Sequence, residues 1–446
     1  MKNSTAIVLF CDNFRINDNQ ALHQAVQNYA NVVLVYVYAE NYLGRNLGAA
    51  SKVFLHYALK SFQNLLHEKY SASLVIRAVK DVNDIAPELL KIHSEHNFEA
   101  IFAAKSYIAR QIKTQEQITQ TFEAKNVKTI FTKGKIIFDT ADVKQFKIFT
   151  PFSKHCFSNL HLLSDMAMSH KTITSKHNLA SLSVDELGLL PTNQGRWAQK
   201  MMQFYETSYD KIEENFVNFI TQKLHSYAEE RNNLEAGQNS AISPFLRFGM
   251  LSPNWCFNFC LTMGGGQNQF ALELLWRDFS YHTAYHNPQI ETEEIRPIYK
   301  NFRWNNDLQH LKLWQKGQTG FDIVDAAMNQ LYTTGTMHGR ARMISASFLI
   351  KDLLCNWKLG EQWFWDTLAD ADPAINPFSW QWVFGSGLDG APYFRIFNPH
   401  LQAQRFDPNF VYRKKWLKPS NHLTPPIVCH NLQSKETMLR YKVALR

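Results

Sequence analysis

Two arginines, two aspartates and an amide are the residues whose types and spacing most clearly permit chemistry. Arg340 and Arg342 open a long apolar stretch, and Asp370, Asp372 and Asn376 close it. Charged groups in so apolar a stretch are costly to bury unless they pair with one another or with a ligand. The residues therefore predict either a buried ligand site or a structural ion pair between two core helices, and the chemistry alone favours neither.

Two helices are expected to carry these charges. The apolar run that follows Arg342 has helical spacing, and Met343 and Trp357 mark its two ends. Pro373 directly follows Asp372, which predicts a second helix that starts at Pro373 with Asp372 as its N-cap. The two helices would converge where the arginines and the aspartates can meet.

A second set of residues has the pattern of a phosphate site. Hydroxyl groups precede an expected helix start in the segment Asn239-Ser240-Ala241-Ile242-Ser243-Pro244, and Tyr227 and Arg231 lie upstream. Free backbone N–H groups and the positive end of a helix dipole bind anions. An ordinary N-cap uses the same residue types, and for the segment taken alone it is the more frequent explanation.

A third pattern places a carboxylate beside an indole. Glu273 and Trp276 are three residues apart and would share one face of a helix. Such a pair could contact a nucleic-acid base, because the acid can bond the base edge while the ring stacks on it. A half-buried amphipathic helix would show the same spacing.

Composition and charge limit the class of protein. The chain has 446 residues, of which 45% are apolar and 19% charged, as in soluble proteins of two or three domains. The net charge of +8 favours an anionic partner such as nucleic acid, although many basic proteins bind no polyanion. The chain opens without a secretion signal and has no apolar run long enough to span a membrane, so we expect a cytoplasmic protein.

Cysteine spacing argues against a metal or disulfide framework. The six cysteines are scattered and form no CxxC pair. Cys256 and Cys260 are four residues apart and would share a helix face, where we expect them to be core residues.

The pattern divides the chain into three parts, and the fold class is α/β followed by all-α. Residues 1–131 alternate β-rich and helical runs, which predicts a doubly wound parallel α/β domain. Residues 132–195 have the composition of a long surface linker with short helices. Residues 196–446 are helical, and all 11 tryptophans lie at or after Trp197. The expected strands are Thr5–Phe10, Val32–Tyr38, Leu74–Val79, Ala100–Ala104 and Val127–Phe131, and two expected helices are Lys52–Tyr70 and Val82–His96.

Five motifs follow one another in the second half of the chain: WQKGQTGFDIVDAAMNQL (314–331), ASFLIKDLL (346–354), DADPAIN (370–376), SWQW (379–382) and APYFRIFNP (391–399). Together and in this order they resemble the DNA photolyase/cryptochrome family. The resemblance is strongest from about residue 227 to 417 and is closest to class I cyclobutane pyrimidine dimer photolyases. It is weaker in the first domain, where Leu9 and Cys11 replace the family's usual Trp and Arg.

The resemblance implies that the helical domain binds FAD and that the reduced form is the active one. The Arg342–Asp370 pair would lie beside the flavin ring, and Ser240 and Ser243 fit the phosphate site described above. Asn376 would face flavin N5, and this amide favours repair over signalling because plant cryptochromes carry an acid there. The cofactor-binding residues carried over from the family are Tyr227, Arg231, Ser240, Ile242, Ser243, Arg277, Arg342, Asp370, Asp372 and Asn376.

The resemblance also implies a reaction, the light-driven repair of cyclobutane pyrimidine dimers in DNA. In this family, excited reduced FAD donates an electron to a flipped-out dimer, the cyclobutane ring splits and the electron returns. We expect a carbon–carbon lyase that acts on damaged DNA as a monomer. The catalytic residues would be Glu273, Trp276, Met343 and Asn376, the DNA contacts Glu273, Trp276 and Arg340, and the electron-transfer chain Trp304, Trp357 and Trp380. Arg395 and Lys351 are further candidates for phosphate contacts.

Two other functions are compatible with these residues. One is a cryptochrome-type blue-light photoreceptor that binds FAD but repairs little. Thr336 and Gly339 keep this alternative open, because dimer photolyases usually have Trp and Asn at these places in the lesion pocket. The other is a flavin-free nucleotide-binding or scaffold protein, which would be colourless when purified.

The antenna chromophore is poorly defined by the sequence. Members of the family that bind folate use an Asn-Glu pair where this chain has Arg110 and Gln111, so a folate antenna is doubtful and another antenna or none is possible. The first domain has neither GxGxxG nor a P-loop, and any ligand it binds is expected at the carboxyl ends of its strands.

Overall fold

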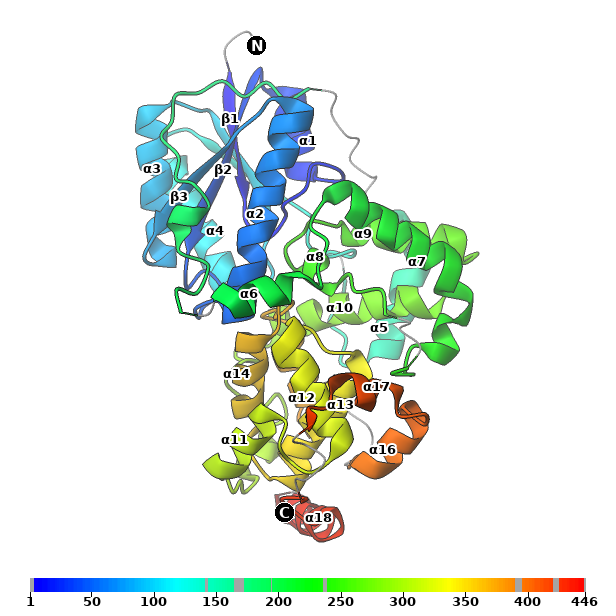
Figure 1. Cartoon of the computed structure of the whole chain (residues 1–446). Helices are drawn as coiled ribbons and strands as arrows, with labels where there is room; N and C mark the ends of the chain where they lie inside the picture. The colour runs from blue at the N-terminus through cyan, green and yellow to red at the C-terminus, as the bar shows by residue number, and fades with distance from the viewer. Residues whose placement is uncertain are drawn as a thin grey trace.

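The structure, a computed structural model, describes residues 4–140, 143–163, 172–193, 195–235, 239–389, 395–419 and 425–444. Residues 391–394 of the last family motif lie outside these ranges. Figure 1 shows a sheet with helices on both sides and, below it, a second domain made of helices. No helix in the described ranges combines the length and the hydropathy that a bilayer crossing needs.

Five parallel strands form one sheet in the order β3-β2-β1-β4-β5. Alternate residues of each strand point to opposite faces, so the continuous apolar runs fill two cores. Val8 and Phe10 pack with helices α1 and α2, and Ile7 and Leu9 pack with α3 and α4, which confirms the doubly wound fold. The elements are β1 (Thr5–Phe10), α1 (Gln20–Asn28), β2 (Asn31–Ala39), α2 (Ala49–Tyr70), β3 (Leu74–Val79), α3 (Ile85–Glu95), β4 (Ala100–Ala104), α4 (Ala109–Glu123) and β5 (Lys128–Thr132).

The predicted strands agree closely with the observed ones. β1, β3 and β4 match residue for residue, whereas β2 is one residue longer at each end and β5 is shifted by one residue. The helix predicted over Val82–His96 starts with a short 3-10 turn, Val82–Asp84, before α3. Local apolar patterning therefore defines this domain well.

The segment that follows the sheet is more buried than its composition predicts. Ile136, Ile137 and Phe138 lie in a core shared by both domains, and Asp278 accepts the backbone N–H groups of Ile137 and Phe138 at 2.8 Å each. Helix α5 (Phe149–Ser158) contributes Phe149, Phe152 and Cys156 to the same core. The prediction of a surface linker is wrong here, because this apolar trio is too short to stand out from the polar residues around it.

The described residues after 195 form helices, as predicted, and no strand is found among them. These elements are α6 (Gly195–Met202), α7 (Tyr209–Glu230), α8 (Ser243–Arg247), α9 (Pro253–Met263), α10 (Gln269–His286), the 3-10 turn η4 (Pro297–Asn301), α11 (Leu308–Lys316), α12 (Asp322–Thr334), α13 (Gly339–Ser347), the π-helical turn η5 (Phe348–Asp352), α14 (Trp357–Thr367), α15 (Ile375–Phe384), α16 (Pro399–Phe406), α17 (Val411–Trp416) and α18 (His430–Ala444). Cys256 and Cys260 are buried in α9, as expected.

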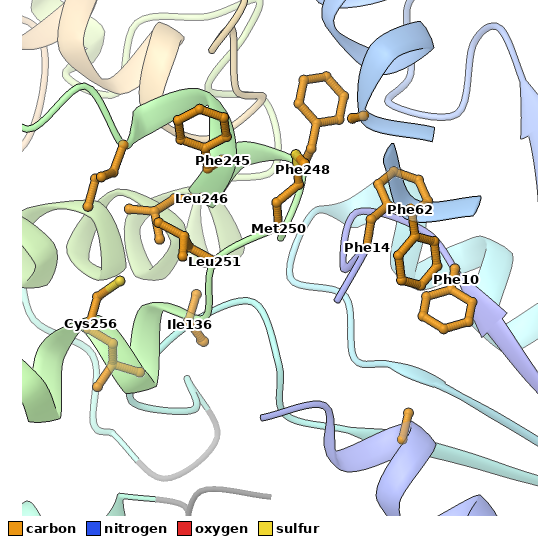
Figure 2. Close-up of a cluster of buried hydrophobic side chains, with 14 of the residues drawn as sticks. Phe10, Phe14, Phe62, Ile136, Phe245, Leu246, Phe248, Met250, Leu251 and Cys256 are labelled. Atoms are coloured by element: carbon orange, nitrogen blue, oxygen red, sulfur yellow. The ribbon is translucent and has the colours of Figure 1, made fainter. Parts of the chain in front are cut away.

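The two domains share a hydrophobic core. Phe54 of α2 stacks on Phe248, which follows α8, with ring centroids 5.3 Å apart and planes inclined by 23°. Figure 2 shows Phe10, Phe14 and Phe62 of the first domain on one side of this contact, with Phe248 and its neighbours on the other. Gly48 tightens a second contact, because a Cβ there would lie 2.0 Å from the Trp365 carbonyl oxygen of α14. The helical domain is therefore held firmly against the α/β domain.

Candidate functional site

The predicted pairing of arginine and aspartate occurs between Arg342 and Asp370. Arg342 Nη2 donates to Asp370 Oδ2 at 2.8 Å, and its Nε donates to the Met337 carbonyl oxygen at 2.8 Å. The Asp370 side chain is only 4% exposed, and its Oδ1 has no hydrogen-bond partner in the described part of the chain. A buried acceptor without a partner costs about 1–3 kcal/mol, so this oxygen is prepared for a donor from a ligand.

Asp372 anchors the loop that precedes α15. Its Oδ1 accepts the backbone N–H groups of Ala374 at 2.9 Å and Ile375 at 3.1 Å, and its Oδ2 accepts the Tyr281 hydroxyl at 2.5 Å. Helix α15 starts at Ile375 and not at Pro373 as predicted, because residues 373–374 form a turn that the Asp372 carboxylate closes. Both oxygens of Asp372 are thus engaged by the protein.

Asn376 is held by a buried acid that the sequence analysis missed. Asn376 Nδ2 donates to Glu361 of α14 twice, to Oε1 at 2.8 Å and to the backbone oxygen at 3.1 Å. Glu361 in turn forms a two-pronged ion pair with Arg45, which lies between β2 and α2. No sequence pattern links these residues, because Arg45 and Glu361 are 316 positions apart.

The expected phosphate segment forms an irregular turn before a short helix. Ala241 has a left-handed backbone, φ 54°, and Asn239 Oδ1 accepts its N–H at 3.1 Å. Ile242, and not Ser243, is the residue that precedes α8, and it is buried. The hydroxyl groups of Ser240 and Ser243 form no hydrogen bond with other described residues, which leaves both free for a ligand.

Glu273 and Trp276 lie on α10 and are both partly exposed, as their spacing predicts. Glu273 is paired with Arg231 at the end of α7 and also accepts from Gln269 at 2.9 Å. Trp276 stacks on Phe149 with ring centroids 3.7 Å apart and an angle of 11°. Both side chains are therefore held by neighbouring residues while part of each remains exposed.

Three further predicted site residues occupy different surroundings. Tyr227 is in the last turn of α7, one turn before Arg231, and burial raises the pKa of its phenol. Met343 is half-buried on α13 beside Arg342. Arg277 is buried in α10, where its guanidinium donates to the Lys135 carbonyl oxygen at 2.6 Å.

The sequence suggests that Arg340 lies near the aspartates. In the structure, Arg340 lies instead beside other arginines. Its guanidinium donates to Asn232 Oδ1 at 2.7 and 3.2 Å. Burial and the nearby charges of Arg231, Arg405 and Arg395 lower the pKa of Arg340, so four arginines share one region. We call Arg231, Arg340, Arg395 and Arg405 the arginine cluster. Such a cluster favours an anionic partner.

The two remaining candidates for phosphate contacts differ in how exposed they are. Arg395 is exposed, whereas Lys351 is buried and donates to the Arg395 carbonyl oxygen. Burial, followed by the charge of Arg395, lowers the pKa of Lys351 to about 7. A buried amine that is already bonded to the backbone is poorly placed for DNA, so Arg395 is the better candidate.

The three tryptophans of the expected electron-transfer chain belong to one hydrophobic cluster. Trp380 and Trp357 are buried, and Trp304 is partly exposed. The ring of Trp380 meets Phe364 at 4.9 Å and Trp314 at 6.3 Å. Helices α14 and α15 approach closely at Gly360, where a Cβ would lie 2.2 Å from Trp380.

A cavity lies at the carboxyl ends of the strands, where a ligand of the first domain is predicted. Its volume is about 30 Å³, which is room for about one water molecule, and Cys11, Tyr38 and Gln115 line it. Asp12, also in the lining, pairs with Lys135 at 2.6 Å and with Arg247 at 3.0 Å. Burial alone would raise the pKa of Asp12, but the two cations outweigh it and lower the pKa to about 2. Sequence reasoning missed this three-membered group, which joins three distant segments.

Arg110 and Gln111, the positions of the folate-binding pair in other members, lie at the start of α4. Gln111 is buried, and Arg110 lies beside Gly44. Neither residue lines the cavity at the strand ends.

Known families match both domains. The model of "DNA photolyase" matches residues 6–170, and that of the "FAD binding domain of DNA photolyase" matches residues 270–445. A deoxyribodipyrimidine photo-lyase of Agrobacterium fabrum is 33% identical over 430 residues, which are 94% of this chain and 88% of that protein.

Solved structures agree. A bacterial class III photolyase from Agrobacterium tumefaciens superposes with a TM-score of 0.91 at 29% identity, over 100% of this chain and 98% of that one. A cryptochrome of Synechocystis sp. PCC6803 has the same fold, with a TM-score of 0.85 at 22% identity over 98% of this chain and 100% of its own. The two matched domains and the relative that is similar over nearly the whole length place this chain in the DNA photolyase family of flavin-dependent enzymes.

Proposed function

We propose that this protein repairs cyclobutane pyrimidine dimers in DNA with light, using reduced FAD held in the helical domain. The observation that carries the proposal is the buried Arg342–Asp370 pair, which leaves one carboxylate oxygen without a partner. That oxygen suits a ring N–H of a flavin. The free hydroxyls of Ser240 and Ser243, beside the left-handed turn at Ala241, suit the phosphates of the same cofactor.

Bound FAD would supply the light-driven electron that opens the cyclobutane ring and would take it back afterwards. The protein's part is to hold the lesion and the DNA. Glu273 would bond the base edges of the dimer and Trp276 would stack on them with the ring face opposite Phe149, since both side chains are partly exposed on α10. Base stacking of this kind contributes ~1–3 kcal/mol. The arginine cluster would bind the DNA phosphates, so binding should weaken as salt rises.

The direct test is a repair assay. The purified protein, with FAD reduced, is incubated with dimer-containing DNA, and dimer loss is followed under blue light and in the dark. We expect loss in the light only. Absence of loss from a sample that holds reduced FAD and binds the DNA would contradict the proposal.

The second candidate function is a cryptochrome-type blue-light photoreceptor with little repair activity. One observation favours it: Gly339 is exposed, and a Cβ built there meets no atom within 4 Å. The space next to this position, where dimer photolyases usually have an amide side chain, is therefore open among the described residues. The same repair assay separates the two functions, because a photoreceptor would bind FAD and respond to light without consuming dimers.

A further inference from the structure

We propose that Arg45, a residue of the α/β domain, is a positioning residue for the flavin site. By pairing with Glu361 it fixes which end of the Asn376 side chain faces the cofactor. The inference rests on the proposed function, in which FAD lies beside Asn376. It adds a contribution of the first domain to the chemistry of the second.

Arg45 and Glu361 form an ion pair that contains two hydrogen bonds. Arg45 Nη1 lies 2.8 Å from Oε2 and Nη2 lies 2.5 Å from Oε1, so both prongs of the guanidinium are used. The Glu361 side chain is 4% exposed. The Arg45 guanidinium also lies over the ring of Trp365, 3.6 Å from its centre, and Trp365 is one turn after Glu361 on α14. Lysine could supply the charge at this place, but neither the two-pronged bond nor the flat contact.

The ion pair determines the orientation of the Asn376 amide. Both groups that Nδ2 meets, the Glu361 carboxylate at 2.8 Å and the Glu361 backbone oxygen at 3.1 Å, can only accept hydrogen bonds while the acid is ionised. The amide nitrogen must therefore face Glu361, and Oδ1 is the end left for the cofactor. Oδ1 accepts hydrogen bonds. Since flavin N5 carries a proton when FAD is reduced and none when it is oxidised, this orientation favours the reduced cofactor.

Arg45 is also the cation that offsets an acidic neighbourhood. Two other carboxyl groups, Glu291 and Asp372, act on the same region. Burial raises the pKa of Glu291 to about 7, with Glu361 and Asp372 adding to the rise and Arg45 opposing it. Asp372 has a cation of its own in Arg247, 4.0 Å away. Without Arg45, the buried Glu361 carboxylate would lose its counter-charge and the two hydrogen bonds that fix its position. The Asn376 amide would then be held less tightly and would be free to turn.

The contact is built into the junction of the domains and does not depend on Arg45 alone. Ser51 Oγ donates to the Leu368 carbonyl oxygen at 3.1 Å, and Trp365 Nε1 donates to the Asn46 carbonyl oxygen at 2.8 Å. Removal of the Arg45 side chain should therefore leave α14 in place. Ser51→Ala offers a matched control, because it weakens the same junction without touching Glu361.

The test measures the midpoint potential of bound FAD in the full-length protein, after FAD content has been determined from the spectrum. In Arg45→Gln we expect the ratio of reduced to oxidised FAD, at a fixed potential, to fall roughly tenfold, the effect of about one hydrogen bond. For a two-electron couple this is a shift of about 30 mV. Arg45→Lys should recover most of the shift if charge is the cause, and Ser51→Ala should leave the potential unchanged.

A second variant keeps the inference falsifiable if Arg45→Gln proves unstable. Glu361→Gln keeps Arg45 but replaces the carboxylate that accepts from Asn376 with an amide, which can also donate a hydrogen bond. This variant should show the same shift in the midpoint potential of FAD as Arg45→Gln. The double variant should add little, since both changes act through one contact. An unchanged potential in either single variant, or an equal shift in Ser51→Ala, would overturn the role of Arg45. A wild-type protein that binds no FAD would instead contradict the proposed function itself.

Discussion

The two charged sites of this protein, one in each domain, balance their charges in opposite ways. In the helical domain, Asp370 is paired on one side only and keeps a free oxygen. In the cavity of the α/β domain, Asp12 is closed between two cations, Lys135 and Arg247. The first site is incomplete without a ligand. In the second site, two cations of the protein already balance the charge of Asp12.

This difference assigns ligand binding to the first site and stabilisation of the fold to the second. A site that leaves a buried polar atom unpartnered gives up folding free energy, which a ligand returns on binding. A carboxylate enclosed by buried cations contributes to holding the chain segments together, whatever binds nearby. We therefore expect changes at Asp12 to act on folding and changes at Asp370 to act on the cofactor.

The largest effect is expected from Asp12→Ala. The change leaves Lys135 and Arg247, both buried, without their shared counter-charge, and loss of one partner of a buried pair costs ~3–5 kcal/mol. The free energy of unfolding, measured by denaturant titration, should fall by about this amount. Asp210→Ala removes an exposed pair with Lys69 and should change little. If the free energy of unfolding fell equally in the two variants, the buried ion pairs of Asp12 would contribute no more to stability than an exposed pair.

Asp370→Asn should act on FAD and not on the fold. The amide keeps the size of the side chain but removes the charge that pairs with Arg342, and a hydrogen bond to a charged group contributes ~1.5–3 kcal/mol. FAD affinity should therefore fall roughly 10- to 100-fold, measured by titration of the apoprotein with FAD. If the apoprotein instead loses as much stability as Asp12→Ala does, the contrast between the two sites fails.

Glu273→Ala tests the lesion-binding side of the helical domain. The variant should keep FAD, because it leaves the Arg342–Asp370 pair intact, but it should bind dimer-containing DNA about tenfold more weakly. Repair per absorbed photon should fall as well. Binding to DNA without dimers is the control and should change little. Normal repair by this variant would remove Glu273 from the proposed mechanism.

Trp380→Phe separates two uses of light. We expect it to block photoreduction of oxidised FAD while repair by chemically reduced protein continues, followed by absorption and by dimer loss respectively. Trp314→Phe is the matched control, since Trp314 is equally buried and touches Trp380 but lies outside the expected chain. Photoreduction that survives in Trp380→Phe, and is lost in Trp314→Phe, would move the electron path to the control residue.

Local pattern and family motifs predicted much of this molecule, and long-range contacts supplied the rest. The apolar runs gave the strands of the sheet almost to the residue, and the motif residues Arg342 and Asp370 meet as expected. The pairs Arg45–Glu361 and Asp12–Arg247 could not be predicted, because each joins segments from different domains and periodicity reports only the face of a single element. The burial of residues 136–138 was missed because three apolar residues are too few to show a period among polar neighbours.

The smallest effect is expected from Gly339→Asn, which sharpens the choice between repair and signalling. Gly339 is the first residue of α13, and a Cβ there meets nothing within 4 Å, so the larger side chain fits without strain. If the amide reaches a bound dimer, one added hydrogen bond should raise dimer affinity roughly threefold to tenfold. Gly339→Ala adds the Cβ without the amide and controls for the gain in helix propensity. Equal affinities in the two variants would mean that this position does not face the lesion, and the altered motif would then be no argument for a photoreceptor.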